Sequence, residues 1–246
     1  MDINIRQQFS EKWARYFKNA DLPLAFFYTD QPDVPLPKEE DLHCIIGQLS
    51  GARDGQPLVL SGDMKFCSGG KRYLGFSQSL RPRFEYFLSC GIPGEMEGER
   101  YKKSPELVIE QLRHQASFKA PGKYLVFKRF GQLSEADEPI AVIFFATPDI
   151  LSGLFTLAGF DESDLNAVIT PFGSGCASII QYPYFEYQSA NPRAVLGMFD
   201  VSARPGVPAG ELTFTVPWPK FVRMVENIDE SFLITESWKR VRNRLP

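Results

Sequence analysis

The sequence predicts a mixed α/β protein of the α+β class, in which two diverged repeat halves pack about a pseudo-twofold axis. Short apolar runs of strand length alternate along the chain with amphipathic segments of helical period. Residues of the second stretch also repeat those of the first in the same order. Because 43% of the 246 residues are apolar, the chain can bury a substantial core. We therefore expect residues 1–120 and 121–246 to form two halves of one compact globular unit.

The first half is expected to begin with a helix over residues 5–18, where large apolar side chains recur every fourth position. Its last helix is expected to start at Ser104, because a capping residue is followed by Pro105 at the first helical position and then by an acid. The other expected elements of this half are strands at 24–29, 58–60 and 84–88, a helix at 39–52 and a helix after the glycine-rich turn at 66–70.

The second half is expected to begin with a hairpin, because the apolar runs 124–130 and 140–146 are joined by a polar loop. A second glycine-rich turn follows a short strand and ends at Cys176. The remaining expected elements are a helix at 149–158, strands at 167–170, 194–199 and 212–216, and helices at 218–227 and 230–243.

The proposed duplication depends on an ordered series of matches whose separation drifts only slowly along the chain. The matches keep the same order in both stretches, and the expected element types agree along the series. The matched pairs are Phe26–Thr29 with Phe144–Thr147, Leu58–Ser61 with Ala167–Thr170, Cys67 with Cys176, Gly98-Glu99 with Gly210-Glu211, and Pro105 with Pro217.

Charge and hydropathy exclude several classes of function. The net charge of −3 lacks the basic excess that nucleic-acid binders usually carry. The longest apolar run, Ile140–Ala146, is far shorter than the ~20 residues that cross a bilayer. The first residues show neither a basic region nor an apolar region of a signal peptide. We therefore expect a cytoplasmic protein in a reducing compartment, where structural disulfides are rare.

Two cysteines at equivalent positions of the two halves are the principal candidates for a site. Cys67 is followed by Gly69 and Gly70, and Cys176 is preceded by Gly173 and Gly175. Glycines let the backbone approach a ligand closely, and a helix N-terminus favours a thiolate over a thiol. The cations Lys71 and Arg72 beside Cys67 should act in the same direction.

Four thiolates in a cytoplasmic protein would suit an iron–sulfur cluster or a structural zinc ion. Cys44 and Cys90 are the two additional candidate ligands, although neither has a counterpart in the second half. Cys44 lies in an apolar helical pattern, so simple packing explains it more readily than ligation. The first hypothesis is thus a protein that binds a cluster through Cys67 and Cys176 and passes electrons to a redox partner or senses redox state.

Two other hypotheses remain open. A small-molecule binding module could hold an anionic ligand between the glycine-rich turns, with help from Lys71 or Arg72. A cysteine-dependent enzyme would use Cys67 as nucleophile with His43 or His114 as base, but nothing in the sequence places either histidine near it. A dinucleotide fingerprint at Gly173-Ser174-Gly175 is disfavoured, because the third glycine is missing and Pro171 interrupts the strand-to-turn geometry.

Three strings resemble the domain of unknown function 169 family. They are His43-Cys44 with the later Gly51-Ala52-Arg53-Asp54-Gly55, the run from Phe66 to Phe76, and Gly175-Cys176. The most specific part is Cys-x-Gly-Gly followed by Leu-Gly. The resemblance covers most of the chain and implies a soluble prokaryotic protein. It supplies no reaction and no catalytic residues, but it adds weight to Cys67 and Cys176.

Overall fold

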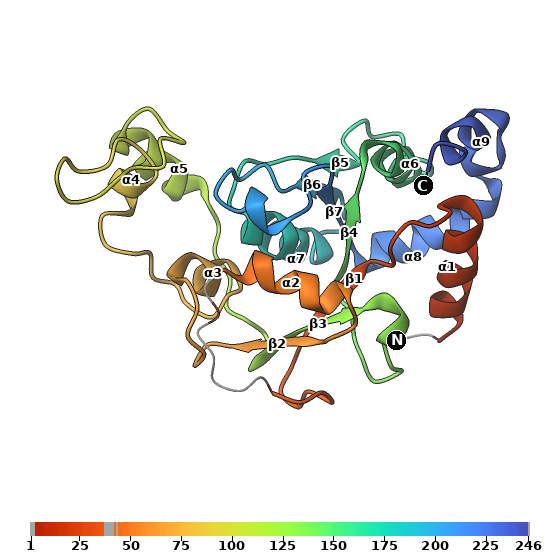
Figure 1. Cartoon of the computed structure of the whole chain (residues 1–246), viewed down its shortest axis with the longest axis horizontal. Coiled ribbons are helices and arrows are strands. Elements are labelled where there is room, and N and C mark those ends of the chain that lie inside the picture. The colour runs from red at the N-terminus through yellow and green to blue at the C-terminus, as the bar shows by residue number, and fades with distance from the viewer. Residues whose placement is uncertain (1–2, 37–41, 43, 246) are drawn as a thin grey trace.

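A computed structural model describes residues 3–36, 42 and 44–245 of the chain. Its described strands form one seven-stranded mixed sheet in the order β2-β3-β1-β4-β7-β6-β5 (Figure 1). Every neighbouring pair is antiparallel except β5 and β6, which are parallel. The strands are β1 (Leu24–Thr29), β2 (Leu58–Ser61), β3 (Tyr124–Arg129), β4 (Ala141–Ala146), β5 (Val168–Ile169), β6 (Ala194–Gly197) and β7 (Leu212–Pro217). This arrangement confirms the mixed α+β class.

The described part of the chain contains nine α-helices. They are α1 (Ile3–Tyr16), α2 (Ile45–Arg53), α3 (Ser68–Tyr73), α4 (Phe84–Phe87), α5 (Pro105–His114), α6 (Pro148–Ala158), α7 (Tyr182–Tyr187), α8 (Trp218–Asn227) and α9 (Glu236–Arg242). A π-helical turn, Ala177–Gln181, runs directly into α7. None of the described helices has the length and apolar character needed to cross a bilayer.

Two hydrophobic cores cover the two faces of the sheet. Side chains alternate between the faces along each strand, so Phe27 of β1 enters one core and Phe26 enters the other. The first core packs the sheet against α1, α6, α8 and α9, with aromatic rings such as Phe9 and Phe221 5.0 Å apart between centroids. The second packs it against α2, the π-helical turn and α7. Each fully buried phenylalanine contributes about 1.5–3 kcal/mol of transfer free energy.

The predicted hairpin between residues 124–130 and 140–146 is wrong. β3 and β4 do not pair with each other, because β1 lies between them and pairs with both. Phe26 of β1 faces Phe127 on one side and Ala141 on the other. An apolar pattern identifies a strand but does not specify its partner, and here the partner comes from the start of the chain.

The predicted strand at 84–88 is also wrong, because these residues form the short helix α4. Its preceding residue, Arg83, has a positive φ of 58°, which redirects the chain into the helix. The rings of Phe84 and Phe87 then share one face of the turn, 6.2 Å apart. In an aromatic run this short, periodicity cannot separate a helix from a strand.

The helix predicted at 230–243 begins later than expected. Two 3₁₀ turns, Ile228–Glu230 and Phe232–Ile234, precede α9. Ser231 and Thr235 interrupt the helical pattern, because their hydroxyls accept the N–H groups of Leu233 and Trp238 and cap the segments that follow them. The expected helix at 39–52 corresponds to α2, and the part of it at residues 39–41 and 43 lies outside the described residues.

The described residues do not show two repeat halves. β3 belongs to the stretch expected to form the second half, yet it lies between β1 and β2 of the first. β7 spans the segment matched to residues 98–105, and that segment contains no strand. At this point the series of matches does not pair a strand with a strand.

Residues 77–117, here called the α4–α5 lobe, project from one end of the sheet. Figure 1 shows α4 and α5 at the left end, away from α1, α8 and α9. The buried side chains of the lobe, such as Phe84 and Val108, belong to neither core of the sheet. The lobe thus forms a separate structural element whose inner side faces α3.

Candidate functional site

A cavity of about 280 Å³ lies where the α4–α5 lobe meets the start of α2, the start of α3 and the segment 172–176. Both glycine-rich turns therefore contribute to one wall, although they come from distant parts of the sequence. The lobe supplies the opposite wall, mainly through aromatic and aliphatic side chains. Its lining includes Cys44, Cys67, Ser68, Gly69, Gly70, Arg81, Phe84, Phe87, Glu99, Tyr101, Gln111, Gln115, Phe172, Gly173, Gly175, Cys176 and Asp200.

Three of the four cysteines line this cavity. Cys44 immediately precedes α2, Cys67 caps α3, and Cys176 precedes the π-helical turn. Cys90 lies on the lobe outside the cavity lining, and its thiol contacts the carbonyl of Gly91. Cys44 is exposed, so the prediction that it simply packs in the core is wrong. Its place before the first turn of α2, rather than inside the helix, explains the exposure.

The first turn is shaped by the thiol of Cys67. Its Sγ accepts the backbone N–H of Gly70 at 3.3 Å and so caps α3. A side chain at position 70 would not fit, because its Cβ would lie 2.9 Å from Cδ1 of Ile45 and 3.0 Å from Sγ of Cys67. Gly70 therefore allows α2 and α3 to approach each other and leaves Cys67 accessible.

The second turn is held by a buried carboxylate. The N–H of Gly175 donates to Oδ2 of Asp200 at 3.0 Å, and a Cβ at position 175 would lie 2.9 Å from Cβ of Ala203. The chain then makes the π-helical turn immediately before Pro183, which has no N–H to give to an earlier carbonyl. Cys176 itself is buried, with 7% of its surface exposed.

The expected lowering of the cysteine pKa values is wrong. Loss of water around the thiol raises the pKa of Cys67 from its usual value of 9.0, which outweighs the opposing effect of the Gly70 N–H. Burial raises the pKa of Cys176 well above that value, with further repulsion from Cys67 and Cys44. Both thiols are consequently protonated at neutral pH and carry no charge.

The two predicted cations do not line the cavity. The ammonium of Lys71 donates to the carbonyl of Gly62 at 2.8 Å, and the guanidinium of Arg72 donates to the carbonyl of Gln78 at 2.6 Å. Arg81 is the cation that lines it among the described residues, with its guanidinium 4.3 Å from the ring centroid of Phe87. In the sequence Arg81 belongs to a basic run with Lys71, Arg72 and Arg83, a pattern that is usually a solvated face.

Asp200 connects the lobe to the second glycine-rich turn. In addition to Gly175, it accepts the hydroxyl of Tyr101 at 3.1 Å and the hydroxyl of Ser202 at 2.8 Å. The ring of Tyr101 also meets that of Phe172 edge-on, 5.9 Å between centroids. Burial raises the pKa of the Tyr101 hydroxyl, which therefore stays protonated and donates.

Two glutamines of α5 line the cavity from the lobe. The side-chain amide of Gln115 donates to Oε1 of Gln181 at 3.5 Å. Gln111 lies one helical turn earlier, and its Oε1 is buried without a hydrogen-bond partner in the described part of the chain. Sequence reasoning missed Gln111, Tyr101 and Asp200, because their roles depend on neighbours that are distant in sequence.

The structure describes one of the two histidines considered as a base. His114 is exposed at the end of α5 and does not line it, and His43 lies outside the described residues. Among residues 3–36, 42 and 44–245, no group of three or more His, Cys, Asp or Glu side chains has the geometry of a metal-ion site. The site thus combines neutral thiols, aromatic rings and a few polar groups.

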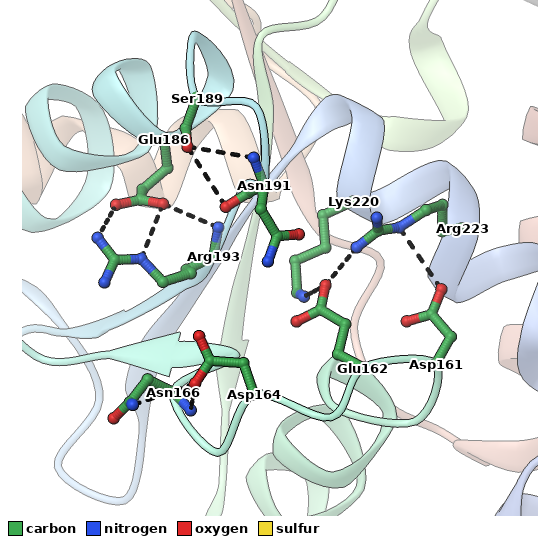
Figure 2. Close-up of polar contacts among 10 residues, drawn as sticks. All are labelled: Asp161, Glu162, Asp164, Asn166, Glu186, Ser189, Asn191, Arg193, Lys220 and Arg223. Carbon is green, nitrogen blue, oxygen red and sulfur yellow. Dashed lines mark hydrogen bonds and ion pairs between the residues drawn. The ribbon is translucent and has the colours of Figure 1, made fainter.

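Other charged clusters serve the fold rather than the cavity. Figure 2 shows Glu162 between Lys220 and Arg223, and Glu186 paired with Arg193. The ammonium of Lys220 is buried and lies 2.8 Å from Oε1 of Glu162. Because each of these charges has an opposite partner, the clusters hold the segments around β5 and α8 in place.

Comparison with known proteins identifies a family but no activity. Residues 15–227 match the DUF169 family, which is described as "Uncharacterised ArCR". No curated protein matches the chain, and no solved structure does.

Proposed function

We propose that this chain, which belongs to the DUF169 family, binds a small molecule in the cavity between its two glycine-rich turns. The observation that carries this proposal is that both turns and three of the four cysteines line the same cavity. Small-molecule sites are concave and mostly apolar, with a small number of convergent polar groups. The rings of Phe84 and Phe87 supply apolar surface here, while Arg81 and Gln111 supply polar groups.

The close packing of the two glycine-rich turns supports a binding site that is already formed in the folded protein. At positions 70 and 175 a Cβ atom would collide with Ile45 and Ile46 of α2, so each turn packs against this helix only as glycine. The protonated thiols of Cys67 and Cys176 favour noncovalent binding over attack by a resting thiolate. We therefore expect a reversible complex with a largely apolar ligand, and Arg81 rather than Lys71 or Arg72 as the cation that contacts it.

A fragment screen by thermal shift tests this proposal. Hits should stabilise the wild-type protein in proportion to their concentration, because they bind only the folded state. Ser68→Phe places a ring at the exposed cavity wall and should abolish the stabilisation. Ser79→Phe is the matched control, since Ser79 is also exposed but does not line the cavity. Hits that stabilise Ser68→Phe and Ser79→Phe equally would contradict cavity binding.

A second candidate is an iron–sulfur cluster held by Cys44, Cys67 and Cys176. It is favoured by the convergence of these three thiols on one cavity. Thiolates that ligate metal must lose their protons, so binding would release the protons that raised pKa values keep on Cys67 and Cys176. A cluster is larger than one ion, so its ligands stand further apart than those of a single-ion site. Such a cluster would serve electron transfer or redox sensing.

Purification without oxygen, followed by iron and sulfide assays, tests the second candidate. A bound cluster should give visible absorption that is lost in Cys44→Ser, Cys67→Ser and Cys176→Ser. Cys90→Ser should retain it, because Cys90 does not line the cavity. Protein that stays colourless and free of iron after reconstitution would eliminate the cluster and leave the small-molecule proposal.

A further inference from the structure

We infer that the ligand carries an N–H or O–H group that donates a hydrogen bond to Oε1 of Gln111. This inference rests on the proposed function, and it names the chemical class of the ligand as a compact, largely apolar molecule with one such donor. Phenols and secondary amides are members of this class.

Gln111 and Gln115 differ in the hydrogen bonds that their side-chain amides make within the protein. They lie one turn apart on α5 and both line the cavity. The side chain of Gln115 is used by the protein, since it hydrogen-bonds to Gln181 and to the hydroxyls of Tyr73 and Tyr182. Oε1 of Gln111 is buried and accepts nothing within the described residues. Oε1 of Gln111 thus remains available to a ligand donor, whereas the amide of Gln115 is already hydrogen-bonded.

A buried acceptor without a partner destabilises the folded protein, because water no longer solvates it. A ligand donor at this point would restore the lost hydrogen bond. A site built in this way also discriminates strongly, since an analogue without the donor would leave Oε1 unpaired. Gln111 would therefore act as a specificity-determining residue.

The surrounding groups define the rest of the ligand. Phe84 and Phe87 of α4 offer ring surfaces on the same side of the cavity as Gln111. The opposite wall presents Cys67 and Cys176 beside glycine backbone. Asp200 already accepts hydrogen bonds from Gly175, Tyr101 and Ser202. Glu99 is the second carboxylate that lines the cavity, and it is exposed to water, unlike Oε1 of Gln111. These surfaces suit an aromatic or aliphatic body that carries one polar hydrogen.

Matched probe pairs test the inference on the full chain. Phenol is compared with anisole, and acetanilide with N-methylacetanilide, because each second member lacks the donor. We expect the wild-type protein to prefer the donor-bearing member by about tenfold in Kd, the effect of one hydrogen bond. In Gln111→Leu the preference should vanish. Gln111→Glu keeps an acceptor and should retain it, and Gln7→Leu, at an exposed position of α1, should behave as wild type.

The outcomes separate the inference from the proposed function. Equal binding of both members to wild type and to Gln111→Leu would overturn the inference while cavity binding stands. A preference that persists unchanged in Gln111→Leu would also overturn it. If no fragment distinguishes Ser68→Phe from Ser79→Phe, the proposed function itself fails.

Discussion

The two glycine-rich turns have similar sequences but place their cysteines in different environments. Cys67 is exposed and caps its own helix by accepting the N–H of Gly70. Cys176 is buried, and its turn is held from outside by Asp200 through the N–H of Gly175. The same residue types thus produce one self-capped turn and one turn that depends on a distant carboxylate. The local sequence determines that a turn forms, and residues distant in sequence determine whether its thiol is exposed or buried.

Replacing Asp200 should have the largest effect, because it removes the external support of the second turn. Asp200→Ala leaves the N–H of Gly175 and the hydroxyl of Tyr101 without their acceptor. We expect the free energy of unfolding to fall by about 2–4 kcal/mol, measured by urea denaturation. Cys67→Ala removes only one cap from the first turn and should cost about 1 kcal/mol or less. Equal losses in the two variants would contradict the contrast between the turns.

Adding one methyl group to each turn should separate them further. In Gly175→Ala the new Cβ would meet Ala203, Ile46 and Met198 at 2.9 to 3.2 Å, so we expect a loss of about 1–3 kcal/mol. In Gly69→Ala the nearest atom, in the ring of Tyr73, is 3.9 Å away. This variant should be neutral or slightly more stable, because alanine favours the helix. Thermal unfolding of both variants measures the difference.

Thiol reactivity should follow exposure. We expect Cys67 to react with a maleimide at least about tenfold faster than Cys176 in the native protein, because Cys176 is buried. Both rates should still be rising at pH 9, since both thiol pKa values lie above their usual value. Mass spectrometry of the labelled peptides measures the two rates. A rate for Cys67 that levels off near pH 7 would indicate a thiolate and contradict this account.

At neutral pH the two thiols contribute no pH dependence, and the expected effect is a slope in stability that appears only at alkaline pH. The pKa of Cys176 is raised in the folded state, so the unfolded chain loses its proton first and stability falls as pH rises above about 9. The slope from one thiol is at most about 1.4 kcal/mol per pH unit. Cys176→Ser should flatten the slope more than Cys67→Ser, because the pKa of the Cys67 thiol is raised less than that of Cys176. Urea denaturation of the wild type and the two serine variants at about pH 8 to pH 10 measures the slopes. Identical slopes in the two variants would contradict the difference in burial between the thiols.

Local patterns predicted much of the framework. The strand at Leu24–Thr29 and the helix at Trp218–Asn227 lie where the apolar pattern places them, and the family resemblance is confirmed. These elements are long and strongly periodic, so neighbours along the chain suffice to identify them. The insertion of β1 between β3 and β4 could not be predicted, because strand pairing depends on residues more than 90 positions apart.

Only the glycine-rich turns and their cysteines could be predicted from the sequence as parts of the site. Glycine beside cysteine is visible in the sequence, and Cys67 and Cys176 indeed line one cavity. The protonation of these thiols depends on desolvation by burial in the folded chain, which no local pattern records. Gln111 and Asp200 acquire their roles from partners that are present or missing in three dimensions.

Mapping a bound fragment by amide chemical shifts tests the central claim most directly. We expect the best fragment hit to shift the amides of Gly70, Gly175 and Gln111 at the cavity. The amide of Val225, in α8 on the other face of the sheet, should not move. Shifts confined to α8 and its neighbours, with those three amides unchanged at saturating fragment, would contradict binding between the glycine-rich turns.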